Sequence, residues 1–194
     1  GGVDGNNYCV ANNSIVGGVN SKITAGNSSV AIGNNASVSG ENSVAFGLNT
    51  TAAGSRSFAV GDGTSALGER SFAANGFTIA QGDSSSAFGS YAVALGVASF
   101  AGGNNASGFI NLSALGEASF AFGKAIDGSS LVAQGIGSFA LGYSGETAQT
   151  GPSNINSVAN GSFAFGRTLN EGSILASSEG SLAGGFANDS LQIN

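Results

Sequence analysis

Acid–base or covalent chemistry in this chain would have to rest on carboxylates. The sequence contains no His, a single cysteine, Cys9, and 11 Asp and Glu residues in 194. Metal sites built from Cys and His, Ser-His-Asp triads and Cys-His nucleophiles therefore cannot be assembled. The acidic residues stand in turn segments, as at Asp62, Glu69, Asp83 and Glu117, without the spacing of calcium-binding repeats. We expect no enzyme activity, no metal and no cofactor.

The cationic residues are fewer still. They are Lys22, Arg56, Arg70, Lys124 and Arg167, in a chain of net charge −6. Binding to a phosphate backbone requires a basic surface, so nucleic acid is not an expected partner. Only 8% of the residues are charged while 41% are hydrophobic and 34 are Gly. This composition excludes a disordered chain and indicates that apolar side chains are buried somewhere.

A five-residue segment, Ser-x-Ala-x-Gly, recurs along the chain with small variations. The copies begin at Ser14, Ser29, Ser43, Ser57, Ser71, Ser85, Ser99, Ser119, Ser138, Ser162 and Ser181. From Ser29 to Ser99 they are 14 residues apart, and afterwards 19 to 24 residues apart. Alternation with period 2 and frequent Gly predict short strands. A fixed period of such strands predicts a solenoid in which each coil contacts its neighbours.

A second, looser strand ending in Gly lies between successive copies, as in Val132-Ala-Gln-Gly135 and Val158-Ala-Asn-Gly161. The sequence therefore predicts an all-β fold, a parallel β-roll or solenoid of about eleven two-strand coils. We expect one domain over residues 1–194, with regular 14-residue coils at about 29–112 and longer coils at about 113–194. The extra residues fall between the first and second strands, so insertions should lie at one corner.

The two faces of the first strand differ in size. Because successive side chains of a strand point to opposite sides, Ser, Ala and Gly share one face and the two x positions share the other. Ten of the 13 Phe residues occupy x positions. The second strand carries small residues and no matching bulky inward ones, so we expect a thin Ser/Ala/Gly interior with an apolar ridge outside. The competing geometry places the large side chains inside the roll and gives a monomer.

An exposed ridge of this kind favours self-association, since monomers rarely show large apolar patches. We therefore predict a homo-oligomer around a central axis. The predicted interface residues are Val30, Ile32, Val44, Phe46, Phe58, Val60, Phe72, Phe88, Phe100, Phe120, Phe122, Phe139, Leu141, Phe163 and Phe165.

Two segments carry a resemblance to a known family. Asn42-Ser-Val-Ala-Phe-Gly47 and Ser29-Val-Ala-Ile-Gly-Asn-Asn-Ala-Ser37 closely resemble the head repeats of trimeric autotransporter adhesins, the YadA-like heads. The similarity covers roughly Tyr8 to Ile193. It implies a left-handed parallel β-roll, three chains around an axis, and export to the outer surface of a Gram-negative bacterium or to an extracellular fibre. Phe in place of Val or Ile, and the corner insertions, depart from the usual head.

The sequence also predicts how the chain relates to a membrane and where its single cysteine lies. No signal segment opens the sequence and no apolar run of roughly 18 residues could span a bilayer. Membrane anchoring is therefore expected only through segments absent from this chain. Cys9 is expected in the second strand of an incomplete first coil, as a small buried residue.

The corner loops are candidates for ligand contact, because long loops on rigid scaffolds often recognise partners. The residues chosen on this ground are Lys124, Asp127, Tyr143, Glu146, Thr147, Pro152, Arg167 and Glu171.

These features predict a non-enzymatic trimeric surface adhesin head that attaches to a host cell, matrix or other cell surface. Its partners would be copies of itself and an extracellular protein or glycan. The alternative is an architectural spacer or shaft of a trimeric fibre that positions another binding domain. A third class, ice or crystal-surface binding, would need an exposed flat array, often rich in Thr, and Thr is scarce in the first strand.

Overall fold

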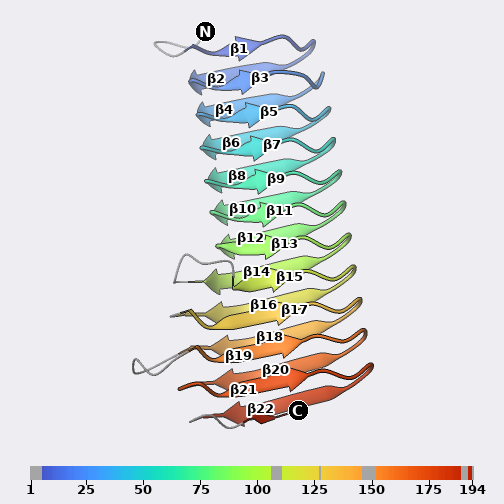
Figure 1. The fold of residues 1–194 in the computed structure, drawn as a ribbon. Coiled ribbons are helices and arrows are strands. Elements are labelled where there is room, and N and C mark those ends of the chain that lie inside the picture. Colours follow the sequence, from blue (N-terminus) through green and yellow to red (C-terminus); the bar gives the residue numbers. More distant parts are fainter. Residues whose placement is uncertain (1–5, 106–110, 127, 146–151, 189–191, 194) are drawn as a thin grey trace. The chain divides into compact units, whose positions relative to one another are not determined.

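The computed structural model describes residues 6–105, 111–126, 128–145, 152–188 and 192–193. These residues form 23 strands, and no helix occurs among them. The chain divides into two compact units, residues 1–88 (unit 1) and 89–194 (unit 2). Within each unit, short strands stack coil upon coil (Figure 1).

Unit 1 contains two parallel sheets, one for each strand of the coil. The first strands are β2 (Ile15–Val19), β4 (Val30–Asn34), β6 (Val44–Leu48), β8 (Phe58–Asp62) and β10 (Phe72–Gly76). The second strands are β1 (Tyr8–Cys9), β3 (Lys22–Ile23), β5 (Ser37–Val38), β7 (Thr51–Ala52), β9 (Ser65–Ala66) and β11 (Ile79–Ala80). Each strand pairs in parallel with the same strand of the next coil.

Unit 2 repeats this arrangement with longer strands. The first strands are β14 (Phe100–Asn105), β16 (Phe120–Ala125), β18 (Phe139–Ser144), β20 (Phe163–Thr168) and β22 (Leu182–Ala187). The second strands are β13 (Ala92–Ala94), β15 (Leu112–Ala114), β17 (Ser130–Ala133), β19 (Asn154–Ser157), β21 (Ser173–Ala176) and β23 (Gln192–Ile193). Strand β12 (Ser86–Ser90) contains the boundary between the units. The predicted all-β parallel solenoid of about eleven coils is confirmed.

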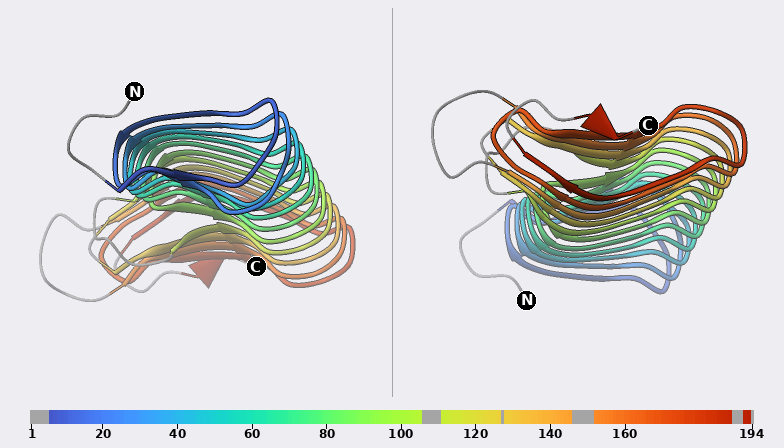
Figure 2. Two further views of the ribbon diagram at one scale, coloured as in Figure 1. Left: turned by 90° about the horizontal axis from the view of Figure 1, so that it is seen from above. Right: turned by 90° about the horizontal axis from the view of Figure 1, so that it is seen from below.

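The coils of each unit follow nearly the same path and bend at the same corners when they are viewed along the stacking direction (Figure 2). In unit 2 the connections from β16 to β17 and from β18 to β19 contain the added residues. Insertions thus occur between first and second strands, as the sequence predicts. They also lengthen the strands beside them, since first strands grow from five residues in unit 1 to six in unit 2.

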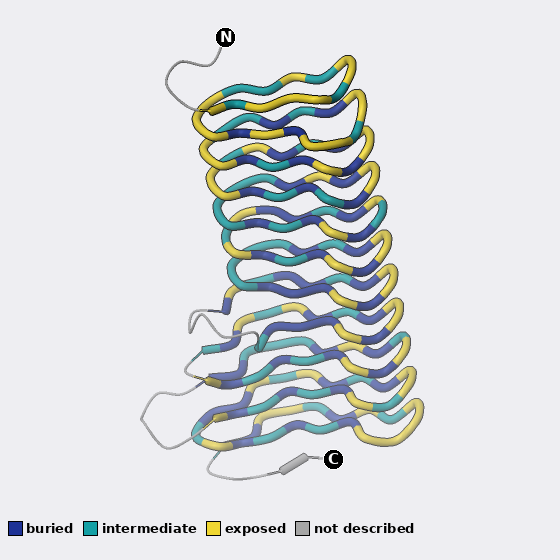
Figure 3. The backbone as a smooth tube through the Cα atoms, turned by 45° about the horizontal axis from the view of Figure 1, so that its top comes forward, coloured by how far each residue is buried: buried dark blue, intermediate teal, exposed yellow. Residues whose placement is uncertain are grey.

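Small side chains fill the interior next to the first strands. Ala31, Ala45 and Ala59 are 0% exposed, and their neighbours along each strand are half-buried or exposed. Figure 3 shows this alternation of buried and accessible positions along the strands. The predicted Ser/Ala/Gly interior is therefore confirmed, and the competing geometry with the large side chains inside is wrong.

The second strands fill their side of the interior with larger residues than the sequence predicts. Leu112, Leu131, Ile155 and Ile174 are all 0% exposed and form one column in register through β15, β17, β19 and β21. The expectation that the second strand lacks bulky inward residues is wrong in unit 2, and also at Ile23 and Val38 of unit 1, which are 0% exposed. Leu112 and Leu131 stand two residues before the small inward residues Ala114 and Ala133.

A register shift explains one further difference. The carbonyl oxygen of Ala159 is the atom that a Cβ on Gly135 would meet, and β19 pairs Ser157 with Ala133. Ala159 thus occupies the place that Gly135 takes one coil earlier. The predicted second strand Val158-Ala-Asn-Gly161 is wrong by two residues, because Gly161 lies in the following turn, where its N–H donates to Ile136 O at 2.8 Å.

A glycine near the end of every first strand except β10, which has Asn75 there, permits close stacking of the coils. A Cβ on Gly47 would collide with the carbonyl oxygen of Gly61 in the next coil, and Gly47 has a φ of +133°. A side chain is excluded there by both contact and backbone conformation. At the following corner Asn35 and Asn49 adopt φ values of 57° and 51°, and Nδ2 of Asn35 donates to Oδ1 of Asn49 at 3.0 Å.

Cys9 lies in β1, which pairs with β3 in the sheet of second strands, as predicted. Its side chain is exposed, however, and the expectation of burial is wrong. Cys9 stands in register with Ile23, which has described coils on both sides and is 0% exposed, whereas Cys9 belongs to the first described coil. The described residues include no helix with the length and hydropathy of a membrane span.

Candidate functional site

The outward face of the first strands carries two columns of apolar side chains, which we call the apolar face. The first column begins at the residue after the repeated Ser and the second lies two residues further on. The fifteen predicted interface residues belong to these columns, together with Ile15 and Leu182, and none of the fifteen is buried in the single chain. Phe46 is 51% exposed, Phe122 48% and Phe139 40%. Neither column contains a charged residue from β2 to β22.

The rings of unit 1 stack along the sheet. The centroids of Phe58 and Phe72 are 5.3 Å apart with the rings 2° from parallel, and those of Phe72 and Phe88 are 4.8 Å apart. Phe72 belongs to the first column and Phe88 to the second. Ala74 and Ser86 at the remaining two positions leave room for this crossing. Stacked pairs contribute about 0.5 to 1.5 kcal/mol each beyond the burial of their area.

Unit 2 has a longer row of rings. Phe120 lies 4.9 Å from Phe100 and 5.7 Å from Phe139 between centroids, and Phe139 lies 5.6 Å from Phe163. Phe165 of the second column tilts against Phe163 at 5.3 Å. A Cβ on Gly184 would collide with the Phe165 ring, so the ring occupies the space that this glycine leaves. The apolar face is thereby a closely packed layer of rings.

A third outward column follows the apolar face and differs from it in charge. In unit 2 it contains Lys124, Tyr143, Arg167 and Phe186, which are paired in register through β16, β18, β20 and β22. We call these four residues the cation–aromatic column. The Nζ of Lys124 lies 5.7 Å from the centroid of the Tyr143 ring, and the Cζ of Arg167 lies 5.3 Å from it on the same ladder. Arg167 Cζ is also 6.0 Å from the Phe186 centroid.

This column unites three of the eight residues predicted to contact a ligand, namely Lys124, Tyr143 and Arg167. Pro152 precedes β19 and Glu171 follows β20, and both are exposed. Asp127, Glu146 and Thr147 lie outside the described residues. Phe186 was not predicted, although it stands five residues after Ser181 just as Arg167 stands five after Ser162. Counting from the repeated Ser would have found it.

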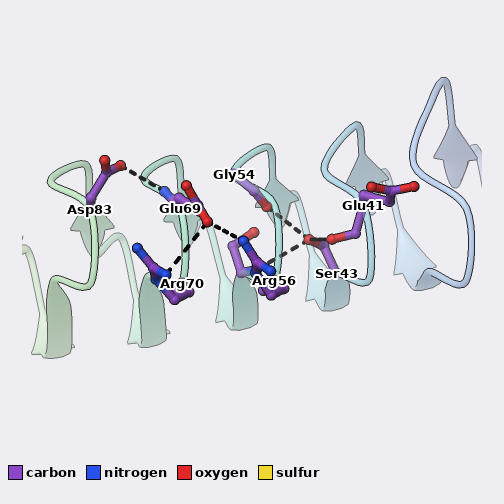
Figure 4. Close-up of polar contacts among 8 residues, drawn as sticks. Glu41, Ser43, Gly54, Arg56, Glu69, Arg70 and Asp83 are labelled. Atoms are coloured by element: carbon purple, nitrogen blue, oxygen red, sulfur yellow. Dashed lines mark hydrogen bonds and ion pairs between the residues drawn. The ribbon is translucent and has the colours of Figure 1, made fainter.

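Turn carboxylates in unit 1 form contacts with the next coils (Figure 4). Arg56 forms an ion pair and hydrogen bond with Glu69, and Arg70 Nη1 lies 3.7 Å from the same carboxylate. The backbone N–H of Glu69 donates to Oδ1 of Asp83 at 2.9 Å. These side chains are 38% to 58% exposed, so their contribution to stability is small. No group of three potential metal ligands occurs in the part of the chain that the structure describes.

The repeats of residues 25–106 match a known family. The family model of the YadA head domain repeat matches residues 25–50, 52–74 and 79–106. No curated protein matches the chain. YadA head repeats belong to a non-enzymatic family of trimeric adhesins that Gram-negative bacteria export to their surface, and the match implies an adhesin-like role. Residues 25–106 of this chain therefore carry YadA head domain repeats, in a parallel β-solenoid that is consistent with a YadA-like head.

Proposed function

We propose that this chain is a non-enzymatic adhesin head that works as a homotrimer and attaches a bacterium to a host cell, a matrix or another cell surface. One observation carries the proposal, namely an apolar face without charge on strands that bear YadA head repeats. Burying one Phe or Val stabilises by roughly 1.5 to 3 kcal/mol. Fifteen half-buried or exposed residues per chain thus supply ample free energy for assembly, even after ordering costs.

In the proposed trimer the apolar faces of three copies meet around the axis, and residues 1–194 act as one head. The protein is exported to the outer surface of a Gram-negative bacterium, or to an extracellular fibre, and segments outside this chain anchor it. The ligand is contacted by residues of unit 2, namely Lys124, Tyr143, Pro152, Arg167 and Glu171 with the undescribed Asp127, Glu146 and Thr147. Many weak contacts repeated on three chains would then give avidity.

Light scattering coupled to gel filtration tests the assembly. We expect three times the chain mass of 18.6 kDa. Replacing Phe122 and Phe165 by Asp should give a folded monomer, because both rings are substantially exposed in the single chain and a buried unpaired carboxylate is costly at an interface. The matched control replaces Leu67 and Leu115, exposed residues that directly follow β9 and β15, by Asp and should leave the mass unchanged. A monomeric wild-type chain would contradict the proposal.

Attachment is tested with the trimer on beads, presented to cultured cells, matrix proteins and glycans. Retention of the beads on at least one surface, with loss on removal of the corner residues, supports adhesion. If the beads are retained on none of these surfaces, the adhesive part of the proposal is contradicted and the spacer role is left.

The spacer role is favoured by one observation in unit 1. Its coils from Ser29 to Ser85 keep a constant spacing of 14 residues, and its corners carry no insertion. This part of the chain is therefore suited to hold other parts in place. A variant that lacks some coils of unit 1 tests this role. Unchanged attachment of that variant would assign the spacer role to unit 1 and the binding role to unit 2.

A further inference from the structure

The cation–aromatic column of unit 2 has a charge that differs from the rest of the chain. The protein carries a net charge of −6 with only five cationic residues, and two of them, Lys124 and Arg167, stand in this column. Arg56 and Arg70 of unit 1 lie beside Glu69, within ion-pair distance. Lys124 and Arg167 form no ion pair with any carboxylate of the described chain, and both are exposed. Their charge is therefore available to an external anion.

The column also holds its cations in fixed places. Lys124 and Arg167 are two strands apart on either side of Tyr143, and neighbouring strands are about 4.8 Å apart, so the two cations stand roughly 10 Å from each other. The Tyr143 ring attracts both cationic groups at 5.7 and 5.3 Å. This contact reduces the side-chain entropy that an anionic ligand would otherwise have to remove.

Its place on the sheet keeps the column accessible in the proposed trimer. The two columns of the apolar face contain no charged residue, whereas the third column contains Asp62 in unit 1 and Lys124 and Arg167 in unit 2. Burying an unpaired charge costs several kcal/mol. The third column therefore belongs to the rim of the interface, where its charges stay in water.

We propose that the cation–aromatic column binds an acidic polysaccharide that runs along the stacked coils. Carboxylate or sulfate groups of the polymer accept hydrogen bonds from Lys124 and from the guanidinium fork of Arg167, which suits planar oxyanions. Phe186, which is 53% exposed, provides an apolar surface for the C–H face of a sugar ring at the end of the column. A linear polymer with anionic groups at regular intervals matches cations that stand two coils apart.

The charge of the whole protein favours this ligand over other polyanions. Nucleic acid presents a phosphate at every nucleotide, and a chain of net charge −6 repels such a dense array. Hyaluronan and other polysaccharides with a single carboxylate in each repeating unit have a lower charge density, so they meet less repulsion when they approach the two cations and the exposed ring. An acidic peptide lacks the fixed spacing and would lose more conformational entropy on binding.

The glycan site names a ligand class for the proposed adhesin. It rests on the proposed function because the polysaccharide must belong to the surface to which the adhesin attaches. Binding itself is measured on the full chain by biolayer interferometry with immobilised heparin and hyaluronan, with neutral dextran, polyglutamate and single-stranded DNA as comparison probes. We expect heparin or hyaluronan to bind, dextran not to bind, and polyglutamate and DNA to bind more weakly than the best polysaccharide.

The double variant K124A/R167A should lose at least about tenfold in affinity, because each charge-assisted hydrogen bond contributes that much. R167K should lose less affinity than R167A. F186A should weaken binding without changing how the affinity depends on salt concentration, because it removes no charge. The matched control R56A/R70A removes the same number of cations from unit 1 and should bind as wild type. Circular dichroism and light scattering on every variant check that fold and assembly are unchanged.

Three results would overturn the proposal: no binding of wild type to either acidic polysaccharide, an equal loss in R56A/R70A and K124A/R167A, or tighter binding to DNA or polyglutamate. A trimer that fails to bind these polysaccharides but attaches to cells through other contacts would refute the glycan site alone. A monomer that binds them through Lys124 and Arg167 would refute the trimer and leave the site.

Discussion

The backbone N–H of Ser57 donates a hydrogen bond to the Oγ of Ser43, one coil earlier, at 3.1 Å. The same hydroxyl donates to the carbonyl oxygen of Gly54 at 2.8 Å, so Ser43 links two coils from inside the solenoid (Figure 4). Ser29 makes the equivalent pair of contacts with Ser43 and Gly40. At Ser29 and Ser43 the first residue of the repeat is thus a polar link between coils, whereas the buried hydroxyls of Ser57 and Ser71 have no hydrogen-bond partner.

Replacing Ser43 by Ala should lower the free energy of unfolding by about 0.5 to 1.5 kcal/mol, because the hydroxyl's bonds to the Ser57 N–H and the Gly54 carbonyl are lost while the 3.3 Å bond between those two groups remains. Urea denaturation followed by circular dichroism measures the change. Ser55→Ala is the control, since Ser55 is exposed. Equal midpoints for the two variants would show that the Ser43 hydroxyl adds nothing to stability.

Most first strands carry a glycine near their end whose replacement should be costly, although β10 has Asn75 at the equivalent place with a φ of 86°. Gly47→Ala places a methyl group against the carbonyl of Gly61 and at a φ of +133°, so we expect a loss of at least about 3 kcal/mol or failure to fold. Gly76→Ala is the matched change, because a Cβ there meets nothing within 4 Å. Thermal melts compare the two, and a Gly47→Ala protein as stable as Gly76→Ala would refute the steric argument.

The inner column of the second strands should contribute strongly to the stability of unit 2. Ile155→Ala leaves a cavity in a position that is 0% exposed, which typically costs 2 to 5 kcal/mol, here about 3. Val158→Ala, at a position that is 39% exposed, should change the melting temperature little. Limited proteolysis of both variants adds a readout specific to unit 2, where cleavage should increase only for Ile155→Ala.

The exposed ion pair between Arg56 and Glu69 should matter little. We expect Glu69→Gln to cost less than about 1 kcal/mol, with the difference shrinking as salt is added. Chemical denaturation at low and high ionic strength measures it. A loss comparable with that of Ser43→Ala, unaffected by salt, would mean that the pair is more than a surface contact.

Much of the fold follows from the sequence because the repeat has a fixed length and alternates in size. Ser29 to Ser99 define the coils, and the position of Phe58 or Phe122 between Ser and Ala already places it on the outer face. Eleven repeats of one pattern leave little choice of register. The exposed apolar face was therefore predicted correctly from period alone.

The second strands were harder to predict, because their length varies and their spacing changes at the corner insertions. Ile155 and Ser157 were missed since Gly161 offered a false end to the strand, and only pairing with Ala133 corrects the register. The cation–aromatic column was not predicted as a unit for the same reason, namely the variable spacing of the coils. Lys124 and Arg167 are far apart in the sequence, and the two intervening coils of unequal length conceal that both stand five residues after a repeated Ser.

Gly47 abuts Gly61 of the next coil, and Gly33 abuts Gly47 in the same way, so these coils fit their neighbours through equivalent surfaces. A gene could therefore gain or lose a coil of 14 codons in this part of the chain without creating a mismatched junction. The length of this stack can therefore change by whole coils through duplication or deletion, whereas a partial coil would break the register between neighbouring strands.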